Sequence, residues 1–139
     1  MKCFFDSNII VDAFTNREGA VDIERRLLYG AIIGEVDGAV SAKQMTDIYY
    51  VLRKYIAKDG LRRELISILL EGLEILPTDK PLLKQALKSA VPDYEDAVIV
   101  ECAKAIGSDF IITNDKDGFK HSDVAIKTPK EAVAFLGLK

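Results

Sequence analysis

The sequence is poor in the side chains that zinc and redox sites use most often. It has two cysteines, Cys3 and Cys102, and a single histidine, His121, in 139 residues. Two cysteines are too few for a disulfide scaffold or a cysteine-rich zinc site, and one histidine excludes mechanisms that need several. We expect both cysteines to pack as small buried side chains and His121 to lie in a loop.

Long apolar runs are also lacking. No stretch is long enough to span a bilayer, because charged residues interrupt the longest ones. Near the N-terminus, Asp6 comes too early for the apolar core of a signal peptide. We therefore expect a cytoplasmic protein with no membrane segment.

The composition is that of a globular protein. Hydrophobic residues make up 49% and charged residues 29% of the 139 residues, which suit one domain, 1–139, with one core. The net charge of −3 argues against a nucleic-acid-binding protein. That argument weakens if several acids bind cations, which offset their charge. One group of basic residues is either a solvated helix face or a rim that contacts phosphate: Arg53, Lys54, Lys58, Arg62 and Arg63.

Short apolar runs alternate with amphipathic segments along the chain. The runs predict strands at 2–5, 39–42, 73–76, 109–113 and 124–126. Helical spacing of apolar residues predicts helices from about Ile9 and at 21–33, 43–55, 61–72, 80–90, 94–106 and 129–135, with a turn at 34–38 and a break at Asp59–Gly60. This alternation predicts an α/β fold, a three-layer α/β/α sandwich with a central parallel sheet of about five strands flanked by about seven helices.

Acidic residues stand after two of the predicted strands. Asp6 ends the first strand, and Asp115 comes shortly after the fourth. Open parallel sheets form active sites outside the carboxyl ends of their strands, so we expect both side chains at one edge of the sheet. Asp6 could cap the first helix, but Ser7 or Asn8 can do that as well, which favours another function for Asp6.

Further acids belong to helices that begin at the same edge. Asp96 lies one turn into the helix at 94–106, and Asp47 lies within the helix at 43–55. Other acids have a simpler explanation as cap, dipole or turn residues, in at most a supporting role: Asp93, Glu95 and Asp117. We expect Asp12 at the surface.

Carboxylates crowded at one edge repel one another, and a hard divalent cation removes that cost. Mg²⁺ and Mn²⁺ prefer oxygen ligands, so no histidine is needed. Such a cation can promote hydrolysis of a phosphodiester. We therefore predict a catalytic metal site formed by Asp6, Asp96 and Asp115. Asp47 lies inside a helix, where exposed acids are common, so its position alone does not assign it to the site.

These segments resemble the PIN domain, a family of metal-dependent nucleases, over nearly the whole chain. The segment 4–12 is similar to the family's opening strand with its metal-binding Asp, here Asp6. The other similar segments are 40–49, 93–97, 111–119 and 128–132. The resemblance implies metal binding by Asp47, Asp96 and Asp115 and support from Ser7, Asn8 and Thr113. The family usually has Glu where this chain has Asp47, whose shorter side chain would shift the metal or require a bridging water.

The resemblance also implies an activity and partners. It implies an endoribonuclease that cleaves RNA with Mg²⁺ or Mn²⁺. Many small members are toxins of toxin–antitoxin systems, which commonly form homodimers and are held by an antitoxin protein. Tyrosines on the helix at 43–55 could form a dimer interface, although on an amphipathic helix they are more often core residues: Tyr49, Tyr50 and Tyr55.

Three other functions are alternatives to this one. A receiver-type signalling domain needs an acid pair after its first strand, and Asp6 has no acidic neighbour. A haloacid-dehalogenase-like phosphotransferase needs an Asp at the position of Asn8, which cannot transfer a proton. A non-catalytic PIN-like RNA-binding module stays open because Asp47 is atypical.

Overall fold

The computed structural model describes residues 1–17 and 21–139. Five strands form one sheet in the order β3-β2-β1-β4-β5. Their bounds are β1 (Lys2–Phe5), β2 (Asp37–Ser41), β3 (Glu74–Leu76), β4 (Phe110–Ile112) and β5 (Ala125–Lys127). All pairings among these strands are parallel, as predicted.

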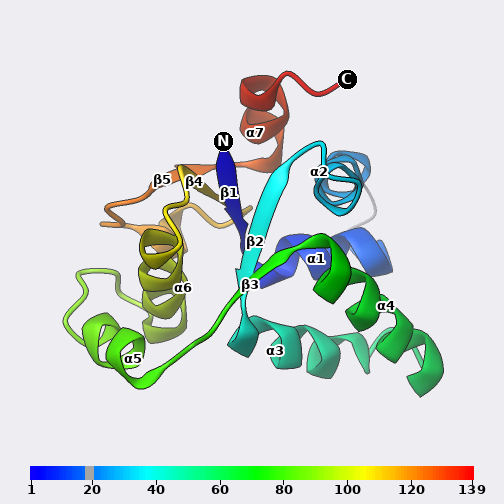
Figure 1. Cartoon of the computed structure of the whole chain (residues 1–139), viewed down its shortest axis with the longest axis horizontal. Helices are drawn as coiled ribbons and strands as arrows, with labels where there is room; N and C mark the ends of the chain where they lie inside the picture. The colour runs from blue at the N-terminus through cyan, green and yellow to red at the C-terminus, as the bar shows by residue number, and fades with distance from the viewer. Residues whose placement is uncertain (18–20) are drawn as a thin grey trace.

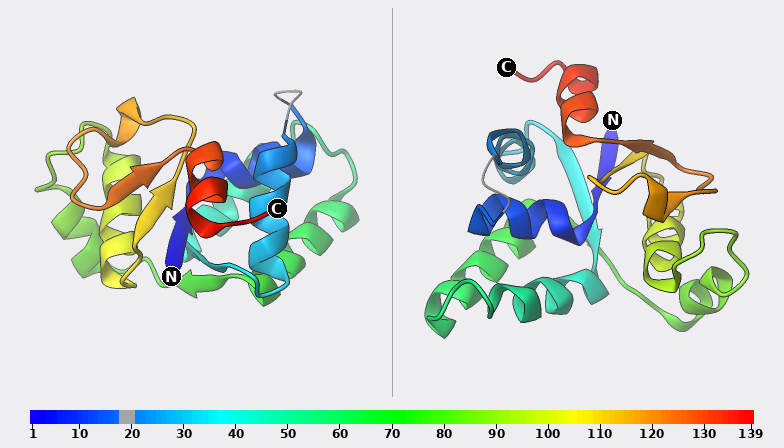
Figure 2. Two further views of the ribbon diagram at one scale, coloured as in Figure 1. Left: turned by 90° about the horizontal axis from the view of Figure 1, so that it is seen from above. Right: turned by 180° about the vertical axis from the view of Figure 1, so that it is seen from behind.

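Helices cover both faces of the sheet (Figures 1 and 2). They are α1 (Ser7–Thr15), α2 (Asp22–Ile32), α3 (Ala42–Leu52), α4 (Asp59–Gly72), α5 (Lys80–Ala86), α6 (Tyr94–Ala105) and α7 (Pro129–Leu136), with a 3₁₀ helix η1 (Asp117–Phe119). α5 and α6 pack on one face and the other α-helices on the opposite face. The predicted α/β/α sandwich is confirmed. In the described part of the chain, no helix combines the length and apolar character that crossing a membrane requires.

The alternation of side chains along the strands explains the two layers of helices. Phe5 and Ile112 contribute to the core beneath α1, α2 and α3. Phe4 and Ile111, one position earlier in each strand, contribute to the core beneath α6. All four side chains are fully buried. Because both faces of the strands are covered, the strands appear in the sequence as continuous apolar runs.

The path of the chain defines the edge at which a site can form. From the central strand β1, the chain runs to β2 and β3 on one side and then crosses to β4 on the other. The direction in which successive strands are added to the sheet therefore reverses between β1 and β4. Open parallel sheets bind ligands outside the carboxyl ends of the strands at such a point. The residues that follow these two strands meet there, and the Asp6 amide donates to the Ile112 carbonyl at 3.0 Å.

Several predicted boundaries are wrong. α4 begins at Asp59, so Asp59–Gly60 opens this helix instead of interrupting the chain before it. α5 ends at Ala86 and is followed by turns, whereas the prediction extended the helix to 90. β2 begins inside the predicted turn at 34–38 and includes Gly38. A Cβ on Gly38 would stand 2.8 Å from the ring of Phe5, so close packing explains a glycine inside a strand.

The predictions of whether single residues are buried or exposed are confirmed for some residues and wrong for others. Cys3 and Cys102 are fully buried, as expected, and burial raises their thiol pKa values to about 12 and about 11. His121 is exposed and lies after η1, as expected of a loop residue. The prediction that Asp12 lies at the surface is wrong: it is 4% exposed, because α2 and α3 both pack against α1, and it accepts a hydrogen bond from Arg17 at 2.5 Å.

The tyrosines of α3 and the turn after it do not belong to the core. Tyr50 is 62% exposed and Tyr55 is 48% exposed. Tyr49 is partly buried, and its hydroxyl donates to the Asp59 carboxylate at the start of α4. The expectation of core packing is therefore wrong for Tyr50 and Tyr55.

Candidate active site

A cavity of about 290 Å³ lies beyond the carboxyl ends of β1 and β2. Side chains from α1, α3 and α6 line it together with the end of β1. The polar residues in its lining are Asp6, Ser7, Asn8, Ser41, Lys43, Gln44, Asp47, Glu95 and Asp96. Three of the four acids predicted to bind metal thus line one cavity, and we call it the acidic pocket.

Asp6 is the most deeply buried acid of the pocket, at 8% exposed. It is also the N-cap of α1, where Ser7 or Asn8 was expected, although its side chain makes no capping hydrogen bond. The hydroxyl of Thr113 donates to Asp6 Oδ2 at 2.8 Å. Burial, and then the nearby charge of Asp115, raise the Asp6 pKa, while the Thr113 hydroxyl and the amides of Asn8 and Ser7 act in the opposite direction.

Thr113 connects Asp6 to the loop that follows β4. Its side chain is fully buried, and its Oγ1 accepts the amide of Asp115 at 3.0 Å. Asp115 Oδ1 in turn accepts the amide of Gly118 at 3.0 Å. One hydroxyl therefore positions both acids, which come from the two neighbouring strands β1 and β4.

Asp96 stands in the first turn of α6, where Asp93 is the N-cap. The Asp93 carboxylate accepts the Asp96 amide at 3.1 Å, as expected of a capping residue. The Asp96 pKa is raised to about 7, first by burial and then by the charges of Asp93, Asp6, Asp115 and Glu95. These acids are therefore close enough for their charges to act on one another.

Gly118 marks the closest approach of two of these acids. A Cβ on Gly118 would stand 2.6 Å from Asp115 Oδ2 and 2.9 Å from Asp96 Oδ2. The two carboxylate oxygens are thus less than about 6 Å apart on either side of one glycine. The loop needs a residue without a side chain here, and the sequence predicted no role for Gly118.

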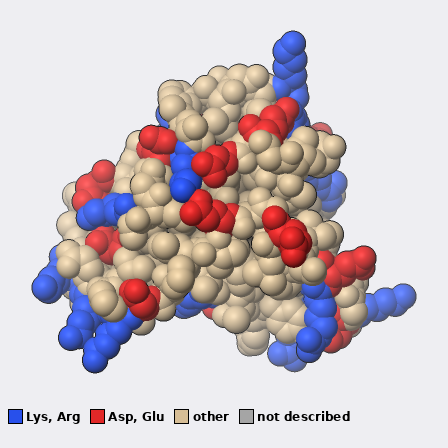
Figure 3. All heavy atoms as spheres, in the orientation of Figure 1, with Lys and Arg blue, Asp and Glu red and all other residues tan. Residues whose placement is uncertain are grey.

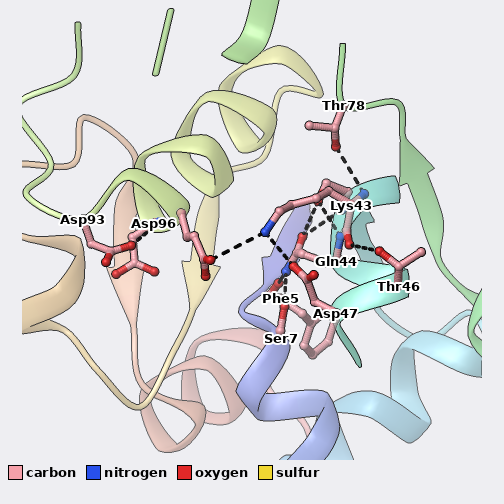
Figure 4. A network of polar contacts seen from close by, with 11 residues as sticks. Phe5, Ser7, Lys43, Gln44, Thr46, Asp47, Thr78, Asp93 and Asp96 are labelled. Carbon is pink, nitrogen blue, oxygen red and sulfur yellow. Dashed lines mark hydrogen bonds and ion pairs between the residues drawn. The ribbon is translucent and has the colours of Figure 1, made fainter. Parts of the chain in front are cut away.

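Asp47 lines the same pocket from α3 but has a different environment. Its Oδ2 lies 2.7 Å from Lys43 Nζ, and the same ammonium group lies 3.9 Å from Glu95 Oε1 (Figure 4). The structure thus brings Asp6, Asp96 and Asp115 together, whereas Asp47 pairs with a lysine.

The predicted supporting residues take different positions. Ser7 Oγ accepts a hydrogen bond from the Gln44 side chain at 3.1 Å. Asn8 is exposed at the pocket, and its Oδ1 accepts from Arg17 at 2.9 Å. Asp117 is exposed and begins η1.

Gln44 is a structural part of the site that the sequence reasoning missed. It is 2% exposed, and its Nε2 donates to the Phe5 carbonyl at 2.8 Å. Its Oε1 accepts the Ser41 amide at 2.8 Å, which completes a capping box at the start of α3. The pattern Ser-x-x-Gln is a known signal of such a box and could have identified it. Gln44 ties the end of β1 to the end of β2.

The residues of the pocket suit a hard divalent cation in their chemistry. Within residues 1–17 and 21–139, no three Asp, Glu, His or Cys side chains are grouped tightly enough to hold a metal ion as they stand. The donors are carboxylate oxygens, which Mg²⁺ and Mn²⁺ prefer. The raised pKa of Asp96 reflects burial and acid–acid repulsion, and a cation would relieve that repulsion. Binding an ion would have to draw Asp6, Asp96 and Asp115 closer together.

The chain corresponds to a known class of protein. Residues 2–117 match the model of the PIN domain, and the chain belongs to this family. It is 30% identical to Ribonuclease VapC1 of Aquifex aeolicus (strain VF5) over 137 residues, which cover 94% of this chain and 92% of that protein.

Solved structures with similar folds come from several bacteria. A chain of VapBC2 from Rickettsia felis, bound to a DNA fragment from its promoter, matches with a TM-score of 0.70 and 17% identity, over 92% of this chain and 98% of that one. A chain of a toxin–antitoxin complex from Klebsiella pneumoniae matches with a TM-score of 0.67 and 18% identity, over 91% and 97%. At these identities the likeness establishes the fold.

Proposed function

We propose that this chain is an endoribonuclease that hydrolyses RNA phosphodiester bonds with Mg²⁺ or Mn²⁺. Asp6, Asp96 and Asp115 hold the cation, assisted by Asp47. The observation that carries the proposal is the approach of three carboxylates from separate segments: Thr113 connects Asp6 to the Asp115 loop, and Asp96 and Asp115 approach across Gly118. Burial and the neighbouring acids raise the Asp96 pKa to about 7. The identity of 30% with a VapC1 ribonuclease supports RNA as the substrate.

The residues of this chain act mainly by positioning. The Thr113 hydroxyl holds Asp6 and the Asp115 loop in register, and the Gln44 side chain holds Ser7 beside them. The Asp93 cap fixes the first turn of α6. A bound divalent cation would supply Lewis-acid stabilisation of the charge that develops on the phosphate and would favour ionisation of a water molecule.

RNA reaches the pocket past the end of α3. Tyr50 is exposed and lines the pocket, and the Arg53 guanidinium lies 5.8 Å from the centre of its ring. Exposed aromatic and basic side chains together are typical of surfaces that bind single strands. On the face in Figure 3, Lys and Arg gather at one lower corner over the end of α3 and the start of α4, and at another over α5.

Of the five residues in the predicted basic group, Lys58 is exposed and is the N-cap of α4, and the other four form two pairs with different surroundings. Arg62 and Arg63 both pair with Asp59 at the start of α4, and its single carboxylate offsets one of their two charges. Arg53 and Lys54 are exposed in the turn that follows α3. We assign phosphate contacts to Arg53 and Lys54.

The biological role that fits this activity is that of a toxin in a toxin–antitoxin system, acting in the cytoplasm as a homodimer and held by an antitoxin protein. The support is the VapC1 relative and the similar folds in toxin–antitoxin complexes. Induced expression of the wild type in a bacterial host should arrest growth, and expression of Asp6→Asn should not. Light scattering of the purified chain measures whether it is dimeric.

The direct test is cleavage of single-stranded RNA by wild type and Asp6→Asn in Mg²⁺, Mn²⁺ or EDTA. We expect cleavage by the wild type with either metal, none in EDTA, and at least about a hundredfold loss in the variant. Circular dichroism of the variant establishes that it is folded. Equal activity of the two proteins refutes the proposal, and RNA binding without cleavage by the wild type supports the non-catalytic module instead.

A further inference from the structure

The carboxylates in and beside the acidic pocket fall into two groups with different surroundings. Asp96 belongs to the first group, where the strongest influences besides burial are four other acids, among them Asp6 and Asp115. Asp47 belongs to the second group, where a lysine ammonium lies within hydrogen-bond distance. The first group is crowded with negative charge, and the second already has a positive charge.

Lys43 supplies that charge from the first turn of α3. Its side chain extends from α3 toward the N-terminal end of α6, where Asp93 and Asp96 lie (Figure 4). It bridges the two helices, at 2.7 Å from Asp47 Oδ2 and 3.9 Å from Glu95 Oε1. Burial lowers its pKa, but Asp47, Glu95 and Asp93 raise it by more, so the group stays charged.

The backbone holds Lys43 at this position as well. Its amide donates to Thr78 Oγ1 at 3.3 Å, and the neighbouring Gln44 anchors the same turn of α3 to the end of β1. The position of the ammonium therefore follows from how α3 begins, together with the i,i+4 spacing that places Asp47 one turn further along the helix.

We propose that the Lys43 ammonium takes the place beside Asp47 that a second divalent cation would otherwise occupy, so that the chain binds a single divalent ion, held by Asp6 and Asp96 of the pocket and by the neighbouring Asp115. A divalent ion at Asp47 would meet the Lys43 charge at contact distance, and like charges at that range repel strongly. Asp47 is then a positioning residue that orients Lys43. The inference rests on the proposed function for the kind of metal, but it concerns the number of ions.

Calorimetric titration with Mn²⁺, together with electron paramagnetic resonance of free Mn²⁺, counts the bound ions in the absence of RNA. We expect one ion in the wild type and two in Lys43→Met, which keeps the aliphatic part of the side chain and removes the charge. The second ion should bind at least about tenfold more tightly to Lys43→Met than to the wild type. Lys43→Arg retains the charge and should bind one.

Lys104 provides a matched control, because its side chain is 40% exposed, as is that of Lys43. Its Nζ also lies between two carboxylates, at 3.4 Å from Glu101 Oε2 and 2.9 Å from Asp123 Oδ2. Lys104→Met should still bind one ion. If it binds a second ion, the effect is not specific to Lys43 but follows from removing any lysine beside acids, and the inference is overturned. Lys43→Gln provides a second neutral variant if Lys43→Met does not fold.

The outcomes separate this inference from the proposed function. Two ions in the wild type, or one in both neutral Lys43 variants, overturn the inference while the metal-dependent function stands. No bound Mn²⁺ in the wild type overturns the proposed function and the inference with it.

Discussion

Replacing Asp96 with asparagine should make the metal-free protein more stable, although it removes a residue that we assign to the metal site. The Asp96 pKa is about 7 in the folded chain, against a usual value of 3.8, because of burial and the charges of Asp93 and Asp6. An acid whose pKa rises on folding binds more protons in the folded state. Its ionisation therefore lowers stability progressively from about pH 4 to about pH 7, with the full cost above that range.

The size of the effect follows from the shift. A rise of about three pKa units corresponds to about 4 kcal/mol at 1.36 kcal/mol per unit. Asp96 is only partly buried and water screens its charge, so we expect about 1–2 kcal/mol in practice. For a chain of this length, that gain corresponds to a rise in Tm of about 3–8 °C.

Thermal unfolding of wild type and Asp96→Asn in EDTA, at pH 4.5 and pH 8, measures the gain. The gain in stability should be small at pH 4.5 and should reach its full size at pH 8. The control Glu64→Gln, which replaces an exposed acid on α4, should give no gain at either pH. Saturating Mn²⁺ should reverse the order, since it stabilises the wild type by binding the folded state. A variant less stable than wild type in EDTA at pH 8 would refute the reasoning.

Three other substitutions test separate parts of the site. Gly118→Ala should keep the fold but weaken Mn²⁺ binding about 10- to 100-fold, because a Cβ would stand 2.6 and 2.9 Å from two carboxylate oxygens; unchanged affinity by calorimetry contradicts this. Thr113→Val should lower the free energy of unfolding, measured in urea, by about 1–3 kcal/mol, since Asp6 loses a buried hydrogen-bond donor. Thr113→Ser keeps the hydroxyl and should retain most of the wild-type stability. Arg53→Gln should lower the salt dependence of RNA binding in EDTA, measured by fluorescence anisotropy, by about 0.7 in log–log slope. Arg63→Gln removes a charge that lies beside the Asp59 carboxylate and should lower that slope less than Arg53→Gln does.

Much of the fold is predictable because its signals are local. Each strand is a short apolar run, and each of the longer helices repeats apolar residues at helical spacing. The alternation of the two implies parallel strands, and parallel strands place their carboxyl ends at one edge. The position of Asp6 and of the Asp115 loop at that edge follows from these steps, without any knowledge of the strand order.

The misassigned residues are those whose state depends on distant packing. Asp12 has the pattern of a surface residue, but α2 and α3 enclose α1 and bury it against Arg17. Tyrosines on an amphipathic helix are more often core residues, yet Tyr50 is exposed beside the pocket. Sequence spacing gives the face of a helix on which a residue lies, but not what covers that face.

For this chain, the sequence by itself indicated the kind of chemistry: acids placed after strands and at helix starts, in the order typical of the PIN domain, in a chain with only one histidine and two cysteines. Only the tertiary structure decided how those acids pair. Asp96 and Asp115 meet across Gly118, while Asp47 meets Lys43. The physical reason is that charge interactions depend on distances of a few ångströms, which the packing of α3 and α6 against the sheet sets.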